Sequence, residues 1–188
     1  MKKIILAALV CMGMSLISCD KIKEMTSKDI TVNGVNLNFP ITINAAAVAP
    51  GEMQLFSAAA PRSFNVTTRV HLDELGKPDM VEWANKITKV AVTNSVVTVT
   101  ANPSGNYIVE NLNITAVTVS GSLIVPTYTF GNPFTLTTEM KAFTGGLFFK
   151  LLRDKVLDVT IKGDTDAPAG TIININYKSD LVLTASLL

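Results

Sequence analysis

Hydrophobic and polar residues alternate along most of the chain that follows residue 29. In seven segments apolar side chains take nearly every second position, as in a strand that buries one face and exposes the other. These segments are 30–43, 63–73, 87–100, 107–119, 122–129, 156–162 and 173–185. No parallel strand–helix–strand rhythm is present. The pattern therefore predicts a mainly β fold, an antiparallel β-sandwich of about eight strands.

Interruptions of the alternation predict turns and loops. Asn33-Gly34 breaks the first segment and is typical of a hairpin or a bulge. The other turns are expected where Asn, Pro, Ser, Asp and Gly gather, at 102–106, 120–121 and 163–170. The stretch 45–61 is rich in Ala and broken by Pro and Gly, so we expect a loop there with one short helical turn.

Two segments have helical spacing. Pro78 suits a first helical turn, and apolar residues at 80, 81, 83, 84 and 87 predict a helix that reaches residue 87. A second helix is predicted over 141–155. Its apolar face comprises Phe143, Leu147, Phe148, Leu151 and Leu152. Gly145 and Gly146 weaken this helix, since each costs about 1 kcal/mol relative to Ala. We expect one or two short helices to cover the sandwich.

The beginning of the chain has the pattern of an export signal. Residues 1–3 are positively charged, and residues 4–14 are almost wholly apolar. This apolar run is too short to span a bilayer, which takes roughly twenty residues. Ser18 then supplies a small residue directly before Cys19, as at a secretory cleavage site. A buried N-terminal helix is the alternative, but the polar residues 20–29 give it no amphipathic continuation.

Residues 16–19, Leu-Ile-Ser-Cys, resemble the lipobox of bacterial lipoproteins, which places an aliphatic, a variable and a small residue before a cysteine. In that family the cysteine thiol receives a diacylglyceryl group, the signal is cut off directly before it, and the new amino group is acylated. The resemblance implies cleavage between Ser18 and Cys19 and lipidation of Cys19. The implied organisation is a signal peptide at 1–18, the lipidated cysteine and a tether at 19–29, and a single β-sandwich domain at 30–188.

The segment 72–90, LDELGKPDMVEWANKITKV, followed by sandwich strands, is similar to small envelope lipoproteins of Bacteroidetes-type bacteria. This similarity carries no functional residues across. It implies a protein held by its lipid at a membrane of a Gram-negative cell envelope, and we expect the outer membrane, on its periplasmic or surface side. Asp20 follows the lipidated cysteine, and different lineages use acidic residues there for inner-membrane retention or for surface export. The membrane and its face therefore stay open.

Processing changes the charge and the cysteine content. Removing residues 1–18 from a chain of 188 leaves 170 residues, and the loss of Lys2 and Lys3 lowers the 16 basic residues to 14 against 15 acidic ones, a net charge of −1. This balance, without a basic cluster, argues against nucleic acid as a partner. Cys11 leaves with the signal, so the mature body has neither a free thiol nor a disulfide.

Catalytic and metal-binding patterns are scarce. His71, the one histidine, lies on the polar face of a predicted strand, and no Gly-x-Ser-x-Gly motif is present. We predict no enzymatic activity and no cofactor; a hydrolase would depend on His71 or an acid. Asp164 and Asp166, in a Gly-bounded turn, are a weak candidate for Ca²⁺, but further ligand positions are missing and solvated acids are the simpler interpretation. Trp83 is expected in the core.

The predicted function is therefore binding. An anchored sandwich typically binds a protein, a glycan or an assembly component through loops or a sheet edge. The alternative is an envelope carrier of an apolar ligand or lipid, in which the 141–155 helix acts as a lid. The residues of that pocket would be Phe143, Leu147, Phe148 and Leu151. A fixed core helix is the other interpretation of the same residues.

Overall fold

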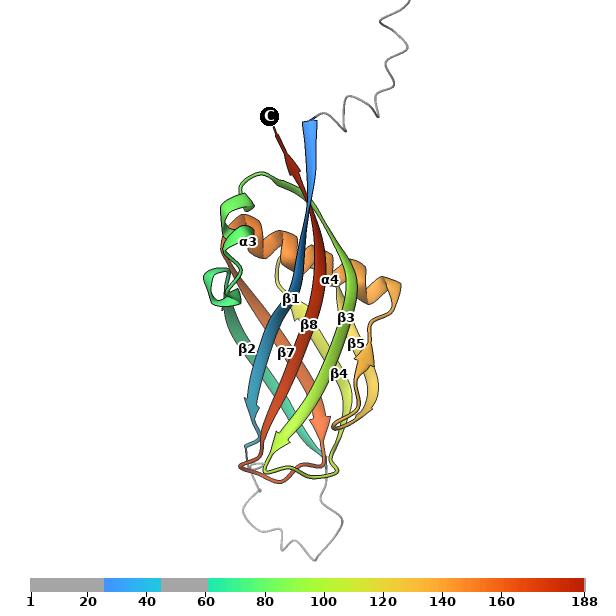
Figure 1. Ribbon diagram of the computed structural model, residues 1–188. Coiled ribbons are helices and arrows are strands. Elements are labelled where there is room, and N and C mark those ends of the chain that lie inside the picture. Colours follow the sequence, from blue (N-terminus) through green and yellow to red (C-terminus); the bar gives the residue numbers. More distant parts are fainter. Residues whose placement is uncertain (1–25, 45–60, 188) are drawn as a thin grey trace, which may run out of the picture.

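Two antiparallel four-stranded sheets pack face to face in the computed structural model, which describes residues 26–44 and 61–187 (Figure 1). Sheet A has the order β1-β8-β3-β6, and sheet B has the order β2-β7-β4-β5. The strands are β1 (Ser27–Thr42), β2 (Arg62–His71), β3 (Ile87–Asn102), β4 (Ile108–Ala116), β5 (Val119–Thr129), β6 (Phe134–Thr135), β7 (Val156–Thr165) and β8 (Ile172–Ser186). The predicted antiparallel β-sandwich of about eight strands is confirmed.

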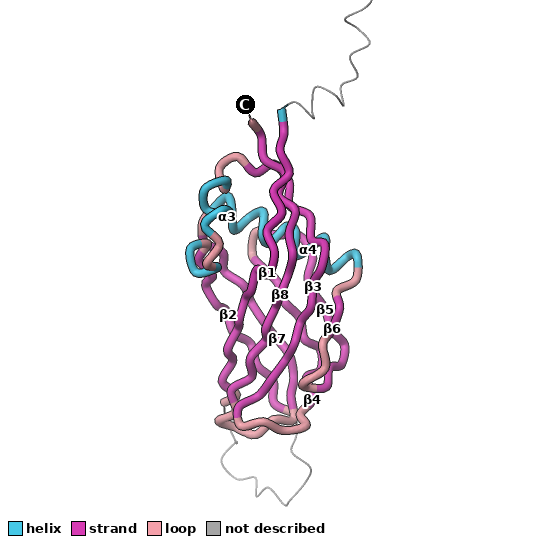
Figure 2. Tube along the Cα trace, in the orientation of Figure 1, coloured by secondary structure: helices cyan, strands magenta, loops and turns pink. Residues whose placement is uncertain are grey.

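Three helices in the described part of the chain accompany the sheets. They are the 3₁₀ helix η1 (Asp73–Leu75) and the α-helices α3 (Pro78–Trp83) and α4 (Thr138–Asp154). Figure 2 shows the helices gathered towards one end of the sandwich, where the chain also enters β1 and leaves β8. At this helical end, Leu187 N–H donates to the Thr26 carbonyl (2.8 Å) and Ser186 N–H to the Lys86 carbonyl (2.8 Å).

Turns and loops form the opposite end, the loop end (Figure 2). There the Gly170 N–H donates to the carbonyl of Ile43 (2.8 Å), which closes the turn between β7 and β8 against the end of β1. A 16-residue strand such as β1 spans about 50 Å at roughly 3.3 Å per residue, so the two ends are well separated.

The long first segment is one strand with an irregularity. Its pairing with β8 shifts register between Val32 and Val35. Gly34 has a φ of 62°, a left-handed conformation that glycine adopts without steric cost, and its N–H donates to Asp180 Oδ1 at 2.8 Å. Of the two interpretations of Asn33-Gly34, the bulge is therefore the one that the structure shows.

Helix α4 packs on β3, β5 and β7 and closes the space between the sheets near the helical end (Figure 1). Thr137 caps its N-terminus, and Lys155 ends it with a φ of 67°. A Cβ on Gly145 would lie 3.0 Å from the Val90 carbonyl oxygen, and one on Gly146 would lie 3.0 Å from Val119 Cγ1. The two glycines that weaken the helix intrinsically therefore allow it to approach both sheets closely.

Three predicted boundaries are wrong. The turn between β4 and β5 lies at residues 117–118, and Gly121, with a φ of 96°, lies inside β5 next to the Phe143 ring. Gly163 to Thr165 continue β7 because they pair with β2 and β4, so the turn begins only after them. The helix predicted to residue 87 ends at Trp83, since Ile87 already belongs to β3. In each case the pairing of strands in the sheets overrides a local turn or helix signal.

Candidate functional site

A shallow groove of about 380 Å³ crosses the outer face of sheet A. Three neighbouring strands supply its outward-facing side chains, which are Asn36 and Asn38 from β1, Val96 and Thr98 from β3, and Asn176 and Lys178 from β8. Its volume falls within the range of about 300–1,000 Å³ that is typical of ligand sites. The intervening residues of the same strands, such as Val97 and Ile175, point into the core.

Strand register aligns these side chains in rows across the sheet. Asn38 lies opposite Asn176, which lies opposite Thr98. The neighbouring row places Lys178 between Asn36 and Val96. Rows two residues apart lie about 7 Å from each other, and side chains within a row about 4.8 Å. A row on the side of the loop end, which joins Pro40, Asn174 and Thr100, extends the same uncharged polar surface.

The polar side chains of the groove differ from those on the rest of this face in their hydrogen bonding. Among the described residues, none pairs with the side chains of Asn36, Asn38, Thr98, Asn176 or Lys178. The same face near the helical end is different, since Thr184 donates to Asp29 (2.7 Å) there and the Thr88 hydroxyl to the Thr184 carbonyl (3.0 Å). The groove therefore has donors and acceptors without a described partner, whereas polar groups nearer the helical end are hydrogen-bonded to one another.

Asp180 borders this region and compensates the groove's one cation. The Gly34 N–H and the Asn94 amide donate to its carboxylate at 2.8 and 3.1 Å. These hydrogen bonds, that of Gly34 first, hold the pKa of Asp180 below its ordinary value, and the charges of Lys178 and Lys77 add to the effect. Asp180 therefore supplies a negative charge near Lys178 and Lys77, and Lys178 is the one cation among the residues that line the groove.

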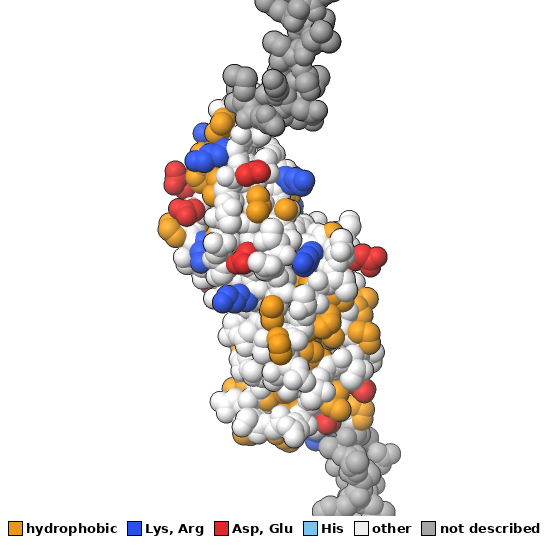
Figure 3. Space-filling model, turned by 45° about the vertical axis from the view of Figure 1, so that its right-hand side comes forward, with side chains coloured by type: hydrophobic (Ala, Val, Ile, Leu, Met, Phe, Trp, Pro, Cys, Tyr) orange, Lys and Arg blue, Asp and Glu red, His pale blue; other side chains and the backbone are white. Residues whose placement is uncertain are grey.

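Charge is also uneven over the molecule. Most of the Lys, Arg, Asp and Glu side chains visible in Figure 3 lie in the upper half of the view, towards the helical end. The half towards the loop end shows mainly uncharged polar and apolar side chains. The groove thus opens on the less charged part of the protein.

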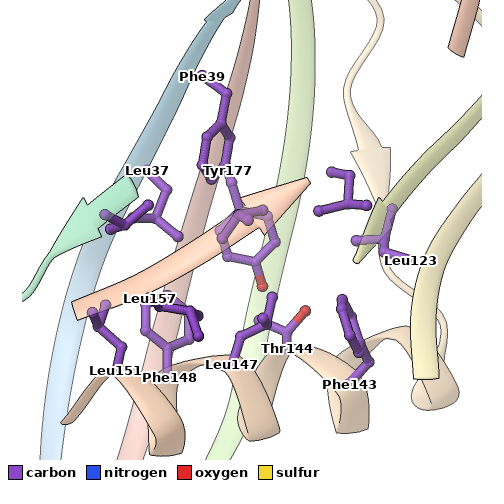
Figure 4. A pocket seen from close by; sticks show the side chains of 13 residues that line it. Leu37, Phe39, Leu123, Phe143, Thr144, Leu147, Phe148, Leu151, Leu157 and Tyr177 are labelled. Carbon is purple, nitrogen blue, oxygen red and sulfur yellow. The ribbon is translucent and has the colours of Figure 1, made fainter. Parts of the chain in front are cut away.

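The four residues predicted for an apolar pocket do lie together. Phe143, Leu147, Phe148 and Leu151 point from α4 into a cavity of about 30 Å³ between the sheets (Figure 4). All four are buried, and the Phe148 and Tyr177 rings lie 6.2 Å apart. A cavity of this size holds no more than about two water molecules.

A small polar cluster lies at one side of this cavity. The Tyr177 hydroxyl is hydrogen-bonded to Ser95 Oγ (2.9 Å) and Ser179 Oγ (2.8 Å), and the two serines also bond to each other. Thr144, which lines the cavity, has a buried Oγ1 that no described group pairs. The site is therefore apolar with one unused hydroxyl.

Asp164 and Asp166, the weak Ca²⁺ candidates, border a second groove of about 180 Å³ near the loop end, together with Glu110. The Ser63 hydroxyl (2.6 Å) and the Asn111 amide (3.2 Å) donate to Asp164 and, Ser63 first, lower its pKa. The Ile108 N–H donates to Asp166 at 2.8 Å. No group of three metal-binding side chains with suitable geometry occurs in the described residues.

The remaining residues that the sequence singled out are distributed as follows. His71 is exposed at the end of β2. Trp83 is only partly buried against the core, and the ammonium groups of Lys28 and Lys86 lie 5.4 and 5.7 Å from its ring centroid. Ser18 and Cys19, the signal 1–18, residues 19–25 of the tether and residues 45–60 lie outside the described residues. No described helix has the length and apolar character needed to cross a membrane.

The sequence analysis missed the groove. Alternation places Asn36, Asn38, Thr98 and Asn176 on outward faces, but it does not show that β1, β8 and β3 are neighbours. The available signal was compositional: outward positions of these strands are mostly Asn and Thr rather than the charged residues that usually solvate a sheet face.

Comparisons with known proteins add little. No protein-family model matches the chain, and no curated protein matches it. A solved structure of the decameric BFDV capsid protein has a TM-score of 0.41 at 7% identity over 83% of this chain and 99% of that chain. A structure of Desmodium yellow mottle tymovirus has a TM-score of 0.29 at 9% identity over 84% of this chain and 91% of that one. Likenesses of this degree carry no argument about function.

Proposed function

We propose that this chain is a lipid-anchored protein of the cell envelope whose sandwich binds a partner without catalysing a reaction. In this proposal the signal is removed after Ser18, and Cys19 carries the acyl chains. The observation that supports binding is the groove on sheet A, whose polar side chains have no partner among the described residues. Such groups exchange hydrogen bonds with water for hydrogen bonds with a partner at little cost.

The position of the chain ends supports an anchored orientation. Seven residues separate Cys19 from Ser27, the first residue of β1, and even fully extended they reach roughly 25 Å. Since β1 begins at the helical end, a lipid on Cys19 holds that end towards the membrane. The groove lies in the half of sheet A nearer the loop end, where a partner outside the membrane reaches it.

Lipidation is tested directly by mass spectrometry of the N-terminal peptide from the native protein, with Cys19→Ala and Cys11→Ala as a matched pair. We expect an acylated Cys19 in the wild type and in Cys11→Ala, because Cys11 belongs to the removed signal. Cys19→Ala should leave the membrane fraction or accumulate uncleaved. An unmodified Met1 start, or an unacylated Cys19 in a soluble fraction, would overturn the anchoring.

Protease treatment of intact cells then identifies the membrane face. Loss of the folded domain from intact cells, with a periplasmic protein left intact as control, would locate it on the surface. Survival of the domain until the outer membrane is permeabilised would locate it in the periplasm. Cleavage only after the inner membrane is breached would contradict an envelope protein.

The second candidate function, carriage of an apolar ligand, rests on the cavity beneath α4. Its lining is mostly apolar, and the Thr144 hydroxyl, which no described group pairs, suits an acyl chain with a small polar head. The cavity of about 30 Å³ is far too small for such a ligand, so α4 would have to move away from the sheets. Close packing of Gly145 on Val90 and the hydrogen bond from Lys141 Nζ to the Thr93 carbonyl (2.9 Å) hold it in place.

Carriage is tested by native mass spectrometry and by titration with a fluorescent fatty acid. A carrier would co-purify with lipid and bind the probe, and Phe148→Ala would weaken that binding. Absence of both, in protein that carries an acylated Cys19, would count against carriage and leave the groove as the binding site.

A further inference from the structure

The chemistry of the groove on sheet A restricts its partner. An asparagine amide presents two N–H donors and one carbonyl acceptor in a plane, and a threonine hydroxyl is both donor and acceptor. Asn36, Asn38, Thr98 and Asn176 therefore offer mixed donors and acceptors with no charge. A partner that matches them is itself rich in groups that both donate and accept, and carries no charge. Sugar hydroxyls have this property.

Other classes of macromolecule fit less well. A nucleic acid or an anionic polysaccharide requires several cations, but the groove has only Lys178, with Asp180 close by. Protein interfaces usually depend on buried Trp, Tyr or Arg anchors surrounded by apolar residues. The ring of Tyr177, which borders the groove, points instead to the core, where its hydroxyl is bonded to Ser95 and Ser179.

The geometry suits an extended chain. The side chains of Asn38, Asn176 and Thr98 form one row across three strands, a span of about 10 Å. The parallel row contains Val96, whose side chain is 36% exposed and presents an apolar surface to the C–H face of a sugar ring. Two rows of this kind contact consecutive units of an oligosaccharide, and the polar row with Asn174 and Thr100 prolongs the contact.

We propose that the groove formed by Asn36, Asn38, Val96, Thr98, Asn176 and Lys178 binds an uncharged glycan chain. This rests on the proposed function for its location at the cell envelope, and it specifies the partner of that same site. Because no aromatic ring stacks on the sugar, recognition depends on the amide and hydroxyl groups, and a single site binds weakly. Several anchored copies on one membrane would compensate by multivalency.

The experiment uses the full lipoprotein in non-ionic detergent on printed polysaccharides. The neutral probes are laminarin, galactomannan, xyloglucan and soluble starch, and the anionic probes are polygalacturonate and heparin. We expect binding to at least one neutral probe, with little change when salt is raised, because no charge pair is involved. Asn38→Ala combined with Asn176→Ala should reduce that binding about tenfold or more. Both residues are exposed and unpaired with any described residue, so the melting temperature should not change.

A control variant distinguishes the site from a general surface effect. Asn65→Ala removes an exposed asparagine from sheet B and should bind as the wild type does. Lack of binding to every neutral probe, binding confined to the anionic probes, or unchanged binding in the Asn38/Asn176 double variant would each overturn the inference.

Mass spectrometry of Cys19 on the same preparation separates this inference from the proposed function. An acylated protein that binds no neutral glycan refutes the glycan site and leaves the anchored binding protein intact. A protein without acylation that nevertheless binds glycan through Asn38 and Asn176 refutes the anchoring and supports the groove.

Discussion

Gly145 and Gly146 are adjacent glycines of α4, and each lies close to a different kind of neighbouring group. A glycine within a helix costs about 1 kcal/mol relative to alanine, so its presence requires a compensating contact. At Gly145 the contact is the backbone carbonyl of Val90, whereas at Gly146 it is the side chain of Val119. The backbone carbonyl of Val90 can shift less easily than the side chain of Val119, which lies at the beginning of β5.

We therefore predict opposite effects for two neighbouring substitutions. Gly145→Ala should destabilise the protein by about 1 kcal/mol, because overpacking costs of about 1–3 kcal/mol exceed the gain in helix propensity. Gly146→Ala should be neutral or stabilising by up to about 1 kcal/mol, since Val119 can adjust. Urea unfolding measures both. Equal stabilisation by the two variants would show that the Val90 carbonyl leaves room for a Cβ at position 145.

Asp180 is the residue whose ionisation is tied most clearly to the fold of sheet A. The Gly34 N–H, then the Asn94 amide, lower its pKa from 3.8, with smaller contributions from Lys178 and Lys77. A carboxyl group with a lowered pKa in the folded state stabilises the fold above its ordinary pKa, and this contribution is lost as the pH falls through the folded-state value.

The expected result is a pH-dependent difference between wild type and Asp180→Asn. The variant should be the less stable protein at pH 7, and the difference should shrink as the pH falls below the ordinary value of 3.8. Melting temperatures from pH 2 to pH 7 check this. Asn65→Ala, a change at an exposed residue without a titratable side chain, serves as the control, and its difference from the wild type should not converge in this way. A constant difference at every pH would assign the effect to packing instead.

At the scale of elements, α4 is either a fixed part of the core or a movable lid, and its packing distinguishes the two. Its apolar face fills the space between the sheets, and Phe148 is 1% exposed and packs against Tyr177. Phe149, the next residue, is only partly buried. A helix that is part of the core loses much of its packing energy when Phe148 is removed, whereas a lid that opens readily loses little.

Phe148→Ala should therefore destabilise the protein by about 3–5 kcal/mol, the cost of removing a large buried ring. Phe149→Ala, the matched control at the next, only partly buried position of the same helix, should cost clearly less. Chemical unfolding followed by far-UV circular dichroism gives both values. Equal, small effects would favour a movable helix and strengthen the carrier hypothesis.

Local pattern predicted the strands well, because each sheet has a buried and an exposed face and the side-chain period is two. The local pattern failed where the fold around a residue, and not its neighbours in sequence, determines the secondary structure. Ser120-Gly121 has the composition of a turn, but Gly121 lies within β5, where its φ of 96° favours glycine. Gly163 was assigned to a turn, although its pairing with Phe64 extends β7.

The groove could not be predicted from the sequence for the same reason. Its polar residues lie at positions 36, 38, 98, 176 and 178, and they meet because β8, the last strand, pairs with β1 on one side and β3 on the other. Alternation gives the face on which a side chain lies but not the neighbours of its strand. The pocket residues of α4 could be predicted more easily, because all four lie on one face of a single helix.

For the whole molecule, the proposed anchor on Cys19 implies which end faces the membrane. Thr26 bonds to Leu187, and Lys86 bonds to Ser186, so both lie at the helical end. Ala169 is an exposed residue of the turn at the loop end. With β1 about 50 Å long and a tether reach of roughly 25 Å, an anchored molecule holds Lys86 nearer the bilayer than Ala169.

Energy transfer to a membrane dye tests this orientation. The mature body has no thiol besides Cys19, which the acyl group occupies in the proposed form, so Lys86→Cys and Ala169→Cys each provide one labelling site. In vesicles that contain the lipoprotein, we expect a donor at residue 86 to transfer energy to the lipid acceptor more efficiently than the same donor at residue 169. Equal transfer from both would mean that the sandwich lies flat on the membrane, and stronger transfer from residue 169 would contradict an anchor at Cys19. Since the groove lies on the half of sheet A nearer the loop end, the first result leaves it accessible to a glycan beyond the bilayer.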